Sequence, residues 1–235
     1  MTHQTQSDEF QKLESTIKIT FSNRKLLQNV FVHRSYLNEN RDSHLENNEK
    51  LEFLGDSVLS LITSIYLYKR FPELKEGDYT DIKASIVRTE SLAEVGKQLS
   101  LGTYLYLSRG EQIGSGHENT NIIADCFEAL VASIFIDKGF DTAYDFVEKH
   151  LFSDRLPYIV KNKLYLSPKS RLQEVMQAKY KVLPTYEVTQ ESGPEHQKFF
   201  TIKVCLGKKV LGIGSGQSKK QAEEQAAKIA LENGI

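Results

Sequence analysis

Two apolar segments of this chain carry acidic residues at the spacing of a single helix face. The segments cover positions 48–59 and 122–131, and in each the acids are three or four residues apart. They are Glu49, Glu52 and Asp56 in the first segment and Asp125 and Glu128 in the second. Like charges at this spacing repel one another, and burial among apolar side chains raises that cost. A cation removes the repulsion, and Mg²⁺ and Mn²⁺ prefer carboxylate oxygens. The segments therefore predict two packed helices that share a divalent metal ion.

The chain is long enough for two domains, and its charge is unevenly distributed. Positions 167–235 carry 11 Lys and Arg against 7 Asp and Glu, whereas positions 1–166 carry 19 against 24. This asymmetry favours an acidic body that binds metal and a basic tail that meets a polyanion. An excess of four charges is equally consistent with ordinary solvation.

The cysteines and the N-terminus indicate the compartment. Cys126 and Cys205 are the only cysteines, and both have apolar neighbours, as core residues do. No uninterrupted apolar run approaches the ~18 residues of a membrane span, and positions 1–13 are too polar for a signal peptide. We therefore expect a soluble, cytoplasmic protein without a membrane partner.

The hydrophobic period is helical over positions 10–150. Apolar residues recur at helical spacing over 26–31 and 51–66, and the second helix is expected to end before Pro72. Further helices are predicted at 79–87, 89–99, 119–138 and 141–151. Because strand alternation is absent from this pattern, an all-α domain is expected over residues 8–152.

The period changes after a segment with no clear amphipathic pattern. We interpret this segment, 153–166, as a linker before a second domain at 167–235. A helix is predicted at 171–179, strands at 185–190, 199–206 and 209–215, and a helix at 218–231. Ser218 and Gln221 form a capping-box pattern at the start of the last helix. The tail is therefore expected to be an α+β domain of order α-β-β-β-α.

The acid-bearing motifs resemble those of a known nuclease family. The octet 49–56 (EKLEFLGD) and the hexapeptide 124–129 (ADCFEA) resemble the nuclease domain of ribonuclease III. Positions 32–36 and 89–93 match as well, and the tail is similar to the double-stranded-RNA-binding domain that usually follows in the bacterial enzyme. The resemblance spans positions 10–233. Glu-x-x-His, which ferritin-like di-iron bundles require, does not occur in the chain.

The resemblance implies roles for the acids. It assigns metal binding to Glu52, Asp125 and Glu128, catalysis to Asp56 and Glu128, and supporting roles to Glu49 and Glu76. The implied cofactor is Mg²⁺, with Mn²⁺ as a substitute, and no small-molecule cofactor is expected.

Two residues of the octet have alternative interpretations. The resemblance places Phe53 in a pocket of the partner subunit of a homodimer, and burial in this chain's own core is the alternative. Gly55 lies inside a helix pattern, where glycine marks either plain packing or close approach of another backbone or a substrate.

The tail offers three places for contact with double-stranded RNA, which such domains read mainly by shape. These are a helix face, the loop 192–196 and the start of the last helix. The residues implied are Ser170, Gln173, Glu174 and Gln177 on the first, His196 in the second, and Lys219 and Lys220 on the third. Glu223 departs from the family pattern, which often has a basic residue there.

The function implied is a Mg²⁺-dependent endonuclease that cuts both strands of double-stranded RNA. As a homodimer it is expected to leave 5′-phosphate and 3′-hydroxyl ends with short 3′ overhangs, and to process ribosomal RNA precursors and other structured transcripts. The alternative is a non-catalytic RNA-binding protein of the same architecture. Such a scaffold has no need to keep Glu52, Asp56, Asp125 and Glu128 together, and all four are present.

Overall fold

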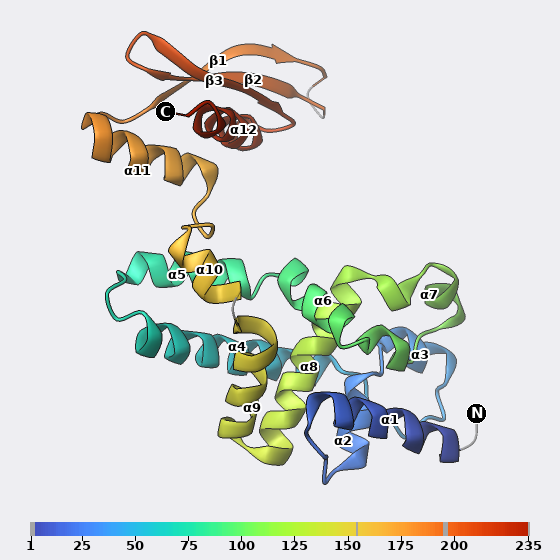
Figure 1. Ribbon diagram of the computed structural model, residues 1–235. Coiled ribbons are helices and arrows are strands. Elements are labelled where there is room, and N and C mark those ends of the chain that lie inside the picture. Colours follow the sequence, from blue (N-terminus) through green and yellow to red (C-terminus); the bar gives the residue numbers. More distant parts are fainter. Residues whose placement is uncertain (1–2, 154, 195–196, 235) are drawn as a thin grey trace. The chain divides into compact units, whose positions relative to one another are not determined.

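The computed structural model describes residues 3–153, 155–194 and 197–234. Its internal contacts divide the chain into two compact units, Met1–Tyr158 and Ile159–Ile235 (Figure 1). The division falls inside the segment predicted as a linker, and a short helix, α10 (Arg155–Lys161), occupies part of that segment. Leu156 of α10 is fully buried, so the N-terminal unit uses residues beyond the limit of 152 expected from the sequence.

The N-terminal unit is helical, as predicted. Its α-helices are α1 (His3–Ile17), α2 (Arg24–Val30), α3 (Arg34–Glu39), α4 (Glu49–Arg70), α5 (Glu76–Ile86), α6 (Thr89–Gln98), α7 (Arg109–Ile113), α8 (Thr120–Lys138) and α9 (Phe140–Val147). Short 3₁₀ turns lie at η1 (Leu101–Tyr104) and η2 (Gly116–Glu118). A π-helical turn, η3 (Glu148–Phe152), follows α9 where the sequence predicted one continuous helix.

Helix α8 lies at the centre of this unit. It packs against α2, α4, α6 and α9, and it is apolar on nearly every side, as a central helix must be. Phe127, Leu130 and Ile134 are fully buried in it. Helix α4 supplies Leu59 and Ile62 to the same core. The acids of α4 and α8 are therefore carried by the two helices that form the centre of the unit.

Length and composition alone would allow α4 to cross a membrane. That is a weak indication, because buried core helices of soluble proteins meet the same criterion. The inner face of α4 is buried against α8, which explains its apolar character.

The C-terminal unit has the predicted order α-β-β-β-α. Its elements are α11 (Pro168–Tyr180), β1 (Thr185–Ser192), β2 (Phe199–Leu206), β3 (Lys209–Gly216) and α12 (Lys219–Glu232). The strands form one antiparallel sheet in the order β1-β2-β3, with Val188 opposite Ile202 and Ile202 opposite Gly214. Helix α12 packs on β2 and β3, and α11 packs on α12 (Figure 1).

Small residues allow α12 to lie close to the sheet. A Cβ on Gly214 would lie 2.1 Å from the backbone nitrogen of Ala226, so only glycine fits there. Ser218 caps α12 by accepting the N–H of Gln221 (3.2 Å). The Gln221 side chain accepts the N–H of Gln217 rather than that of Ser218, so only half of the predicted capping box forms.

Candidate active site

A buried asparagine fixes the first turn of α4. Asn48 is 3% exposed, and its Nδ2 donates to the carbonyl of Val30 (3.1 Å). Its backbone N–H donates to the carbonyl of Val32 (2.9 Å), and its own carbonyl accepts the N–H of Glu52 (2.8 Å). The start of the helix is therefore anchored to the chain before it, which orients Glu52.

Gly55 allows the backbones of α4 and α8 to touch. A Cβ at this position would lie 2.0 Å from the carbonyl oxygen of Glu128 and 2.5 Å from its carbonyl carbon. This contact explains a glycine inside a long helix, where it costs up to about 1 kcal/mol relative to alanine. Glu52 and Asp56 flank Gly55, so the contact brings the acids of α4 to Glu128. Of the alternatives for Gly55, close approach of a second helix is correct.

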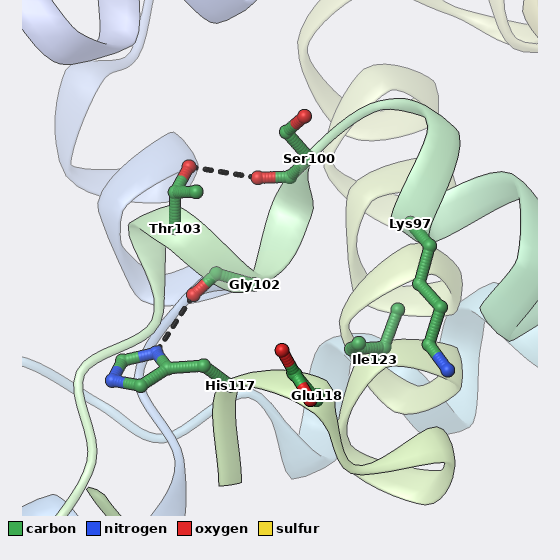
Figure 2. A pocket seen from close by; sticks show the side chains of 7 residues that line it. All are labelled: Lys97, Ser100, Gly102, Thr103, His117, Glu118 and Ile123. Atoms are coloured by element: carbon green, nitrogen blue, oxygen red, sulfur yellow. Dashed lines mark hydrogen bonds between the residues drawn. The ribbon is translucent and has the colours of Figure 1, made fainter. Parts of the chain in front are cut away.

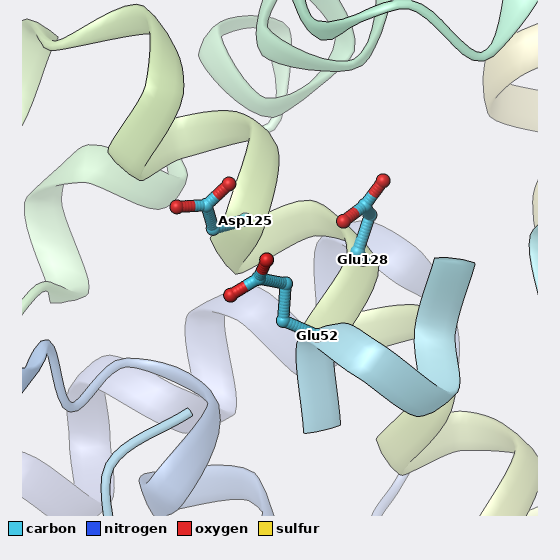
Figure 3. A group of neighbouring side chains, drawn as sticks. All are labelled: Glu52, Asp125 and Glu128. Carbon is cyan, nitrogen blue, oxygen red and sulfur yellow. The ribbon is translucent and has the colours of Figure 1, made fainter. Parts of the chain in front are cut away.

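Three carboxylates converge at this contact. Glu52 of α4 faces Asp125 and Glu128 of α8, and one carboxylate oxygen from each lies within 4.8 Å of the others (Figure 3). All three side chains are half-buried. Three oxygen donors at this separation, from two anchored helices, could hold a hard divalent cation.

Burial and mutual repulsion disfavour the charged forms of the carboxylates in this cluster. Burial, and then Asp56, Glu52 and Asp125, raise the pKa of Glu128 from 4.5 to about 8. Burial and the neighbouring Asp125 raise the pKa of Glu52, and burial raises the pKa of Asp125. Groups whose charged forms are disfavoured in this way, at one place, are typical of a metal or catalytic site. A bound cation would relieve the repulsion.

The other predicted acids differ in their relation to this cluster. Asp56 is exposed and lies near enough to raise the pKa of Glu128. Glu49 raises the pKa of Glu52, and it accepts a hydrogen bond from Asn47 Nδ2 (3.0 Å). Glu76, by contrast, begins α5 and accepts from Thr80 Oγ1 (3.3 Å), and none of the interactions described for it reaches the cluster.

Two basic residues, His33 and Arg34, lie beside the acids, and no role was predicted for them. His33 and Arg34 both lower the pKa of Asp125, and Arg34 NH1 lies 3.6 Å from Glu49 Oε1. His33 also caps α3, where its Nδ1 accepts the N–H of Ser35 (3.3 Å). Positions 33 and 34 lie within the segment 32–36, which resembles the nuclease family, and that resemblance was the signal that could have pointed to them.

Comparison with known proteins identifies the family. The Ribonuclease-III-like family model matches residues 23–155, over half of the chain, and that match includes the whole acid cluster. The chain belongs to the ribonuclease III family. The double-stranded RNA binding motif matches residues 168–233. The protein is therefore an endoribonuclease of this family that carries a double-stranded-RNA-binding domain.

Curated relatives and solved structures agree with this assignment. Ribonuclease 3 of Chloroflexus aurantiacus is 45% identical over 96% of this chain and 91% of its own length. Ribonuclease 3 of Treponema denticola is 42% identical over 96% of this chain and 89% of its own length. The crystal structure of the nuclease domain of ribonuclease III from Campylobacter jejuni matches 62% of this chain and 95% of its own, with a TM-score of 0.56 and 31% identity.

Phe53 lies on the outer face of α4 in this ribonuclease III chain. Its side chain is 79% exposed, so burial in the chain's own core, one of the two interpretations of the sequence, is wrong. Leu61 and Tyr68 of the same helix are also largely exposed. Phe53 is therefore available for contact with a partner.

The predicted RNA-binding residues of α11 are on its surface. Ser170, Gln173, Glu174 and Gln177 lie on α11 and are at least partly exposed. Glu174 is held by Lys163, whose Nζ lies 2.5 Å from Glu174 Oε2. The predicted contact His196 lies outside the described residues.

Lys219 and Lys220 are exposed in the first turn of α12. Lys219 Nζ lies over the ring of Phe200, 5.7 Å from its centroid. The N-terminus of a helix already favours phosphate, and both lysines reinforce that preference. Glu223, which departs from the family pattern, is paired with Lys169 (2.5 Å) and so links α12 to α11.

A separate pocket of about 620 Å³ lies at η1, η2 and the end of α6 (Figure 2). His117 Nδ1 is hydrogen-bonded to the carbonyl of Gly102 (2.8 Å), and Thr103 Oγ1 donates to the carbonyl of Ser100 (2.8 Å). These polar groups stabilise the turns around the pocket. The acids of the cluster are not among its lining residues.

Proposed function

We propose that this protein is a Mg²⁺-dependent endoribonuclease that hydrolyses phosphodiester bonds in both strands of double-stranded RNA. The observation that carries the proposal is the convergence of Glu52, Asp125 and Glu128 at the contact between α4 and α8. These residues would hold the ion. When bound, Mg²⁺ supplies Lewis-acid stabilisation of the phosphoryl oxygens and activates water. Mn²⁺, which prefers the same oxygen ligands, would substitute for it.

The chain's own residues have distinct tasks in this proposal. Asp56 is exposed beside Glu128, so its carboxylate can hold a water molecule and accept a proton at the scissile phosphate. Arg34 limits the net negative charge that an incoming phosphate meets. The C-terminal domain binds the duplex through α11 and the first turn of α12. The products would carry 5′-phosphate and 3′-hydroxyl ends with short 3′ overhangs, and ribosomal RNA precursors are the proposed substrates.

We further propose a homodimer in which Phe53 enters the partner subunit. Its 79% exposed ring supports this, as does a structure described as concerning dimer formation of the Campylobacter jejuni nuclease domain. Sedimentation equilibrium should give about twice the chain mass of 26.8 kDa. Phe53→Ala should shift the distribution toward monomer, because it removes apolar surface from the interface. A wild-type monomer that still makes paired, staggered cuts would contradict the dimer.

The decisive experiment substitutes Glu128→Gln and measures both cleavage and binding of duplex RNA. Gln copies the size of the protonated acid, so folding should persist, but it removes a charge that the ion requires. We expect the variant to bind duplex RNA in a gel shift and to cut it roughly 10²-fold more slowly in Mg²⁺.

Glu148→Gln is the matched control. Glu148 is exposed and interacts with Tyr66 of α4. Tyr66 follows Asp56 by ten residues on this helix, a distance of about 15 Å at the α-helical rise of about 1.5 Å per residue. Its cleavage should match the wild type. If wild-type protein binds the duplex but fails to cut it in Mg²⁺, the non-catalytic RNA-binding function is correct instead.

A further inference from the structure

A basic groove lies between α11 and the turn that follows α10. It has a volume of about 480 Å³, and three cationic side chains and one acid line it, together with apolar residues of α11. The charged residues are Lys161, Lys163, Arg171 and Glu174. The groove therefore has an excess of two positive charges, and all of its lining lies within the C-terminal unit.

The turn that carries Lys163 has a defined backbone. Lys163 has a positive φ of 51°, and its N–H donates to the carbonyl of Val160 (3.1 Å). The N–H of Leu164 donates to the carbonyl of Ile159 (3.0 Å), and Tyr165 is buried. The last residue of α10, Lys161, and the turn that carries Lys163 are thus both held beside α11.

The ion pair between Lys163 and Glu174 contributes little to stability in this position. The two side chains are 53% and 45% exposed, and solvent screens exposed pairs of this kind. Its effect is positional, because it holds the lysine against the surface of α11. Glu174 is also one of the residues expected to contact RNA, so the groove adjoins the RNA-binding face of that helix.

We propose that Lys161, Lys163 and Arg171 form an additional contact for the phosphodiester backbone of duplex RNA. The inference rests on the proposed function of the C-terminal domain. The double-stranded RNA binding motif matches from residue 168, so Lys161 and Lys163 extend the RNA-binding surface beyond that motif. When Lys163 pairs with a phosphate instead of Glu174, the carboxylate of Glu174 becomes free to accept a hydrogen bond from a ribose 2′-hydroxyl.

The test compares wild type with Lys161→Gln/Lys163→Gln in binding a duplex of about 25 base pairs, longer than the roughly 16 that one such domain spans. EDTA is present so that the duplex is not consumed. Each phosphate contact contributes about one to the slope of log affinity against log salt, so the variant's slope should be shallower by about two. Near 0.15 M salt its affinity should be lower by roughly tenfold to thirtyfold.

Two further variants make the result specific. Lys161→Arg/Lys163→Arg keeps both charges and should keep the wild-type slope. Lys208→Gln/Lys209→Gln removes the same charge at the turn between β2 and β3. This turn lies at the opposite end of the sheet from the start of α12, so this variant should also keep the wild-type slope.

Three outcomes overturn the inference, and the last of them is distinguished by failure of the proposed function itself. If wild type binds the duplex and the Lys161→Gln/Lys163→Gln slope is unchanged, the groove is not an RNA contact. An unchanged slope with a lower unfolding midpoint would assign the Lys163–Glu174 pair to stability alone. If wild-type protein itself fails to bind duplex RNA, the proposed function of the domain fails, and this inference fails with it.

Discussion

The carboxyl group of Glu128 decides the net charge of the acid cluster. Burial and three neighbouring carboxylates raise its pKa to about 8, so near pH 7 it mostly carries a proton when no cation is bound. A divalent ion that takes Glu128 as a ligand must displace that proton. Ion binding and proton release are therefore coupled at Glu128.

This coupling predicts that affinity for Mg²⁺ rises between about pH 6 and pH 8.5. Without a divalent ion, the pKa of Glu128 in the folded protein lies above its unfolded value of 4.5, so stability is lost as pH rises toward 8. Mg²⁺ opposes this loss. The difference between unfolding midpoints in Mg²⁺ and in EDTA should therefore widen with pH. In Glu128→Gln the difference should depend much less on pH, and an equal dependence in both proteins would contradict the assignment.

The contact between α4 and α8 is the element on which the acid cluster depends. We expect Gly55→Ala to lower the free energy of unfolding by about 3 kcal/mol, because its Cβ would overlap the backbone of Glu128 and separate the helices. Affinity for Mg²⁺ should fall with it, since Glu52 and Asp56 would move away from α8. Urea unfolding and calorimetric titration of the ion measure the two effects.

Gly77→Ala is the control for this prediction. Gly77 lies in α5, and the place that a Cβ would occupy there has no neighbouring atom within 4 Å. Alanine should therefore leave stability unchanged or raise it by up to about 1 kcal/mol. A Gly55→Ala protein as stable as Gly77→Ala would show that the helices tolerate separation.

The helices and strands followed from the sequence wherever periodicity was strong. Helix α8 is apolar on nearly all sides and α4 has a long apolar stripe, so their pairing and the acids they carry were predictable. The position of Glu76 was not predictable, because a glutamate at the start of α5 has no apolar pattern that fixes its direction. The sequence also could not show that Glu174 binds Lys163, since that contact joins the predicted linker to α11 across eleven positions.

The irregular segments show a different limit. Helix α10 is only seven residues long and contains Pro157, and a pattern of that length does not separate a helix from a linker. The π-helical turn after α9 is only five residues long, too short for its apolar pattern to be told apart from that of a continuing α-helix. Tertiary packing, which buries Leu151 and Phe152, determines the result there.

For the whole molecule, the two units predict a separation of cleavage from tight binding. A protein ending at Tyr158 should fold and cut duplex RNA at low salt and high enzyme concentration, because it retains every acid of the cluster. Its activity should fall as salt rises, since Lys219 and Lys220 are gone. Total inactivity of this folded protein at low salt would show that the tail takes part in catalysis.

The boundary chosen for that truncation matters. A protein ending at Phe152 loses Leu156, which is fully buried, and Arg155, which pairs with Glu94 (2.7 Å). It should unfold at a lower urea concentration than the protein ending at Tyr158, because the loss of Leu156 leaves its apolar neighbours exposed. Equal unfolding midpoints would place the domain boundary before α10.

The backbone contact between Gly55 of α4 and Glu128 of α8 affects which metal ion the acid cluster can bind. Because a backbone contact sets the separation of α4 and α8, the space between their carboxylates cannot widen freely for a larger cation. Mg²⁺ takes oxygen ligands at about 2.0–2.1 Å, whereas Ca²⁺ requires about 2.3–2.6 Å and more ligands. We therefore expect the site to discriminate between divalent ions by ionic radius as well as by charge.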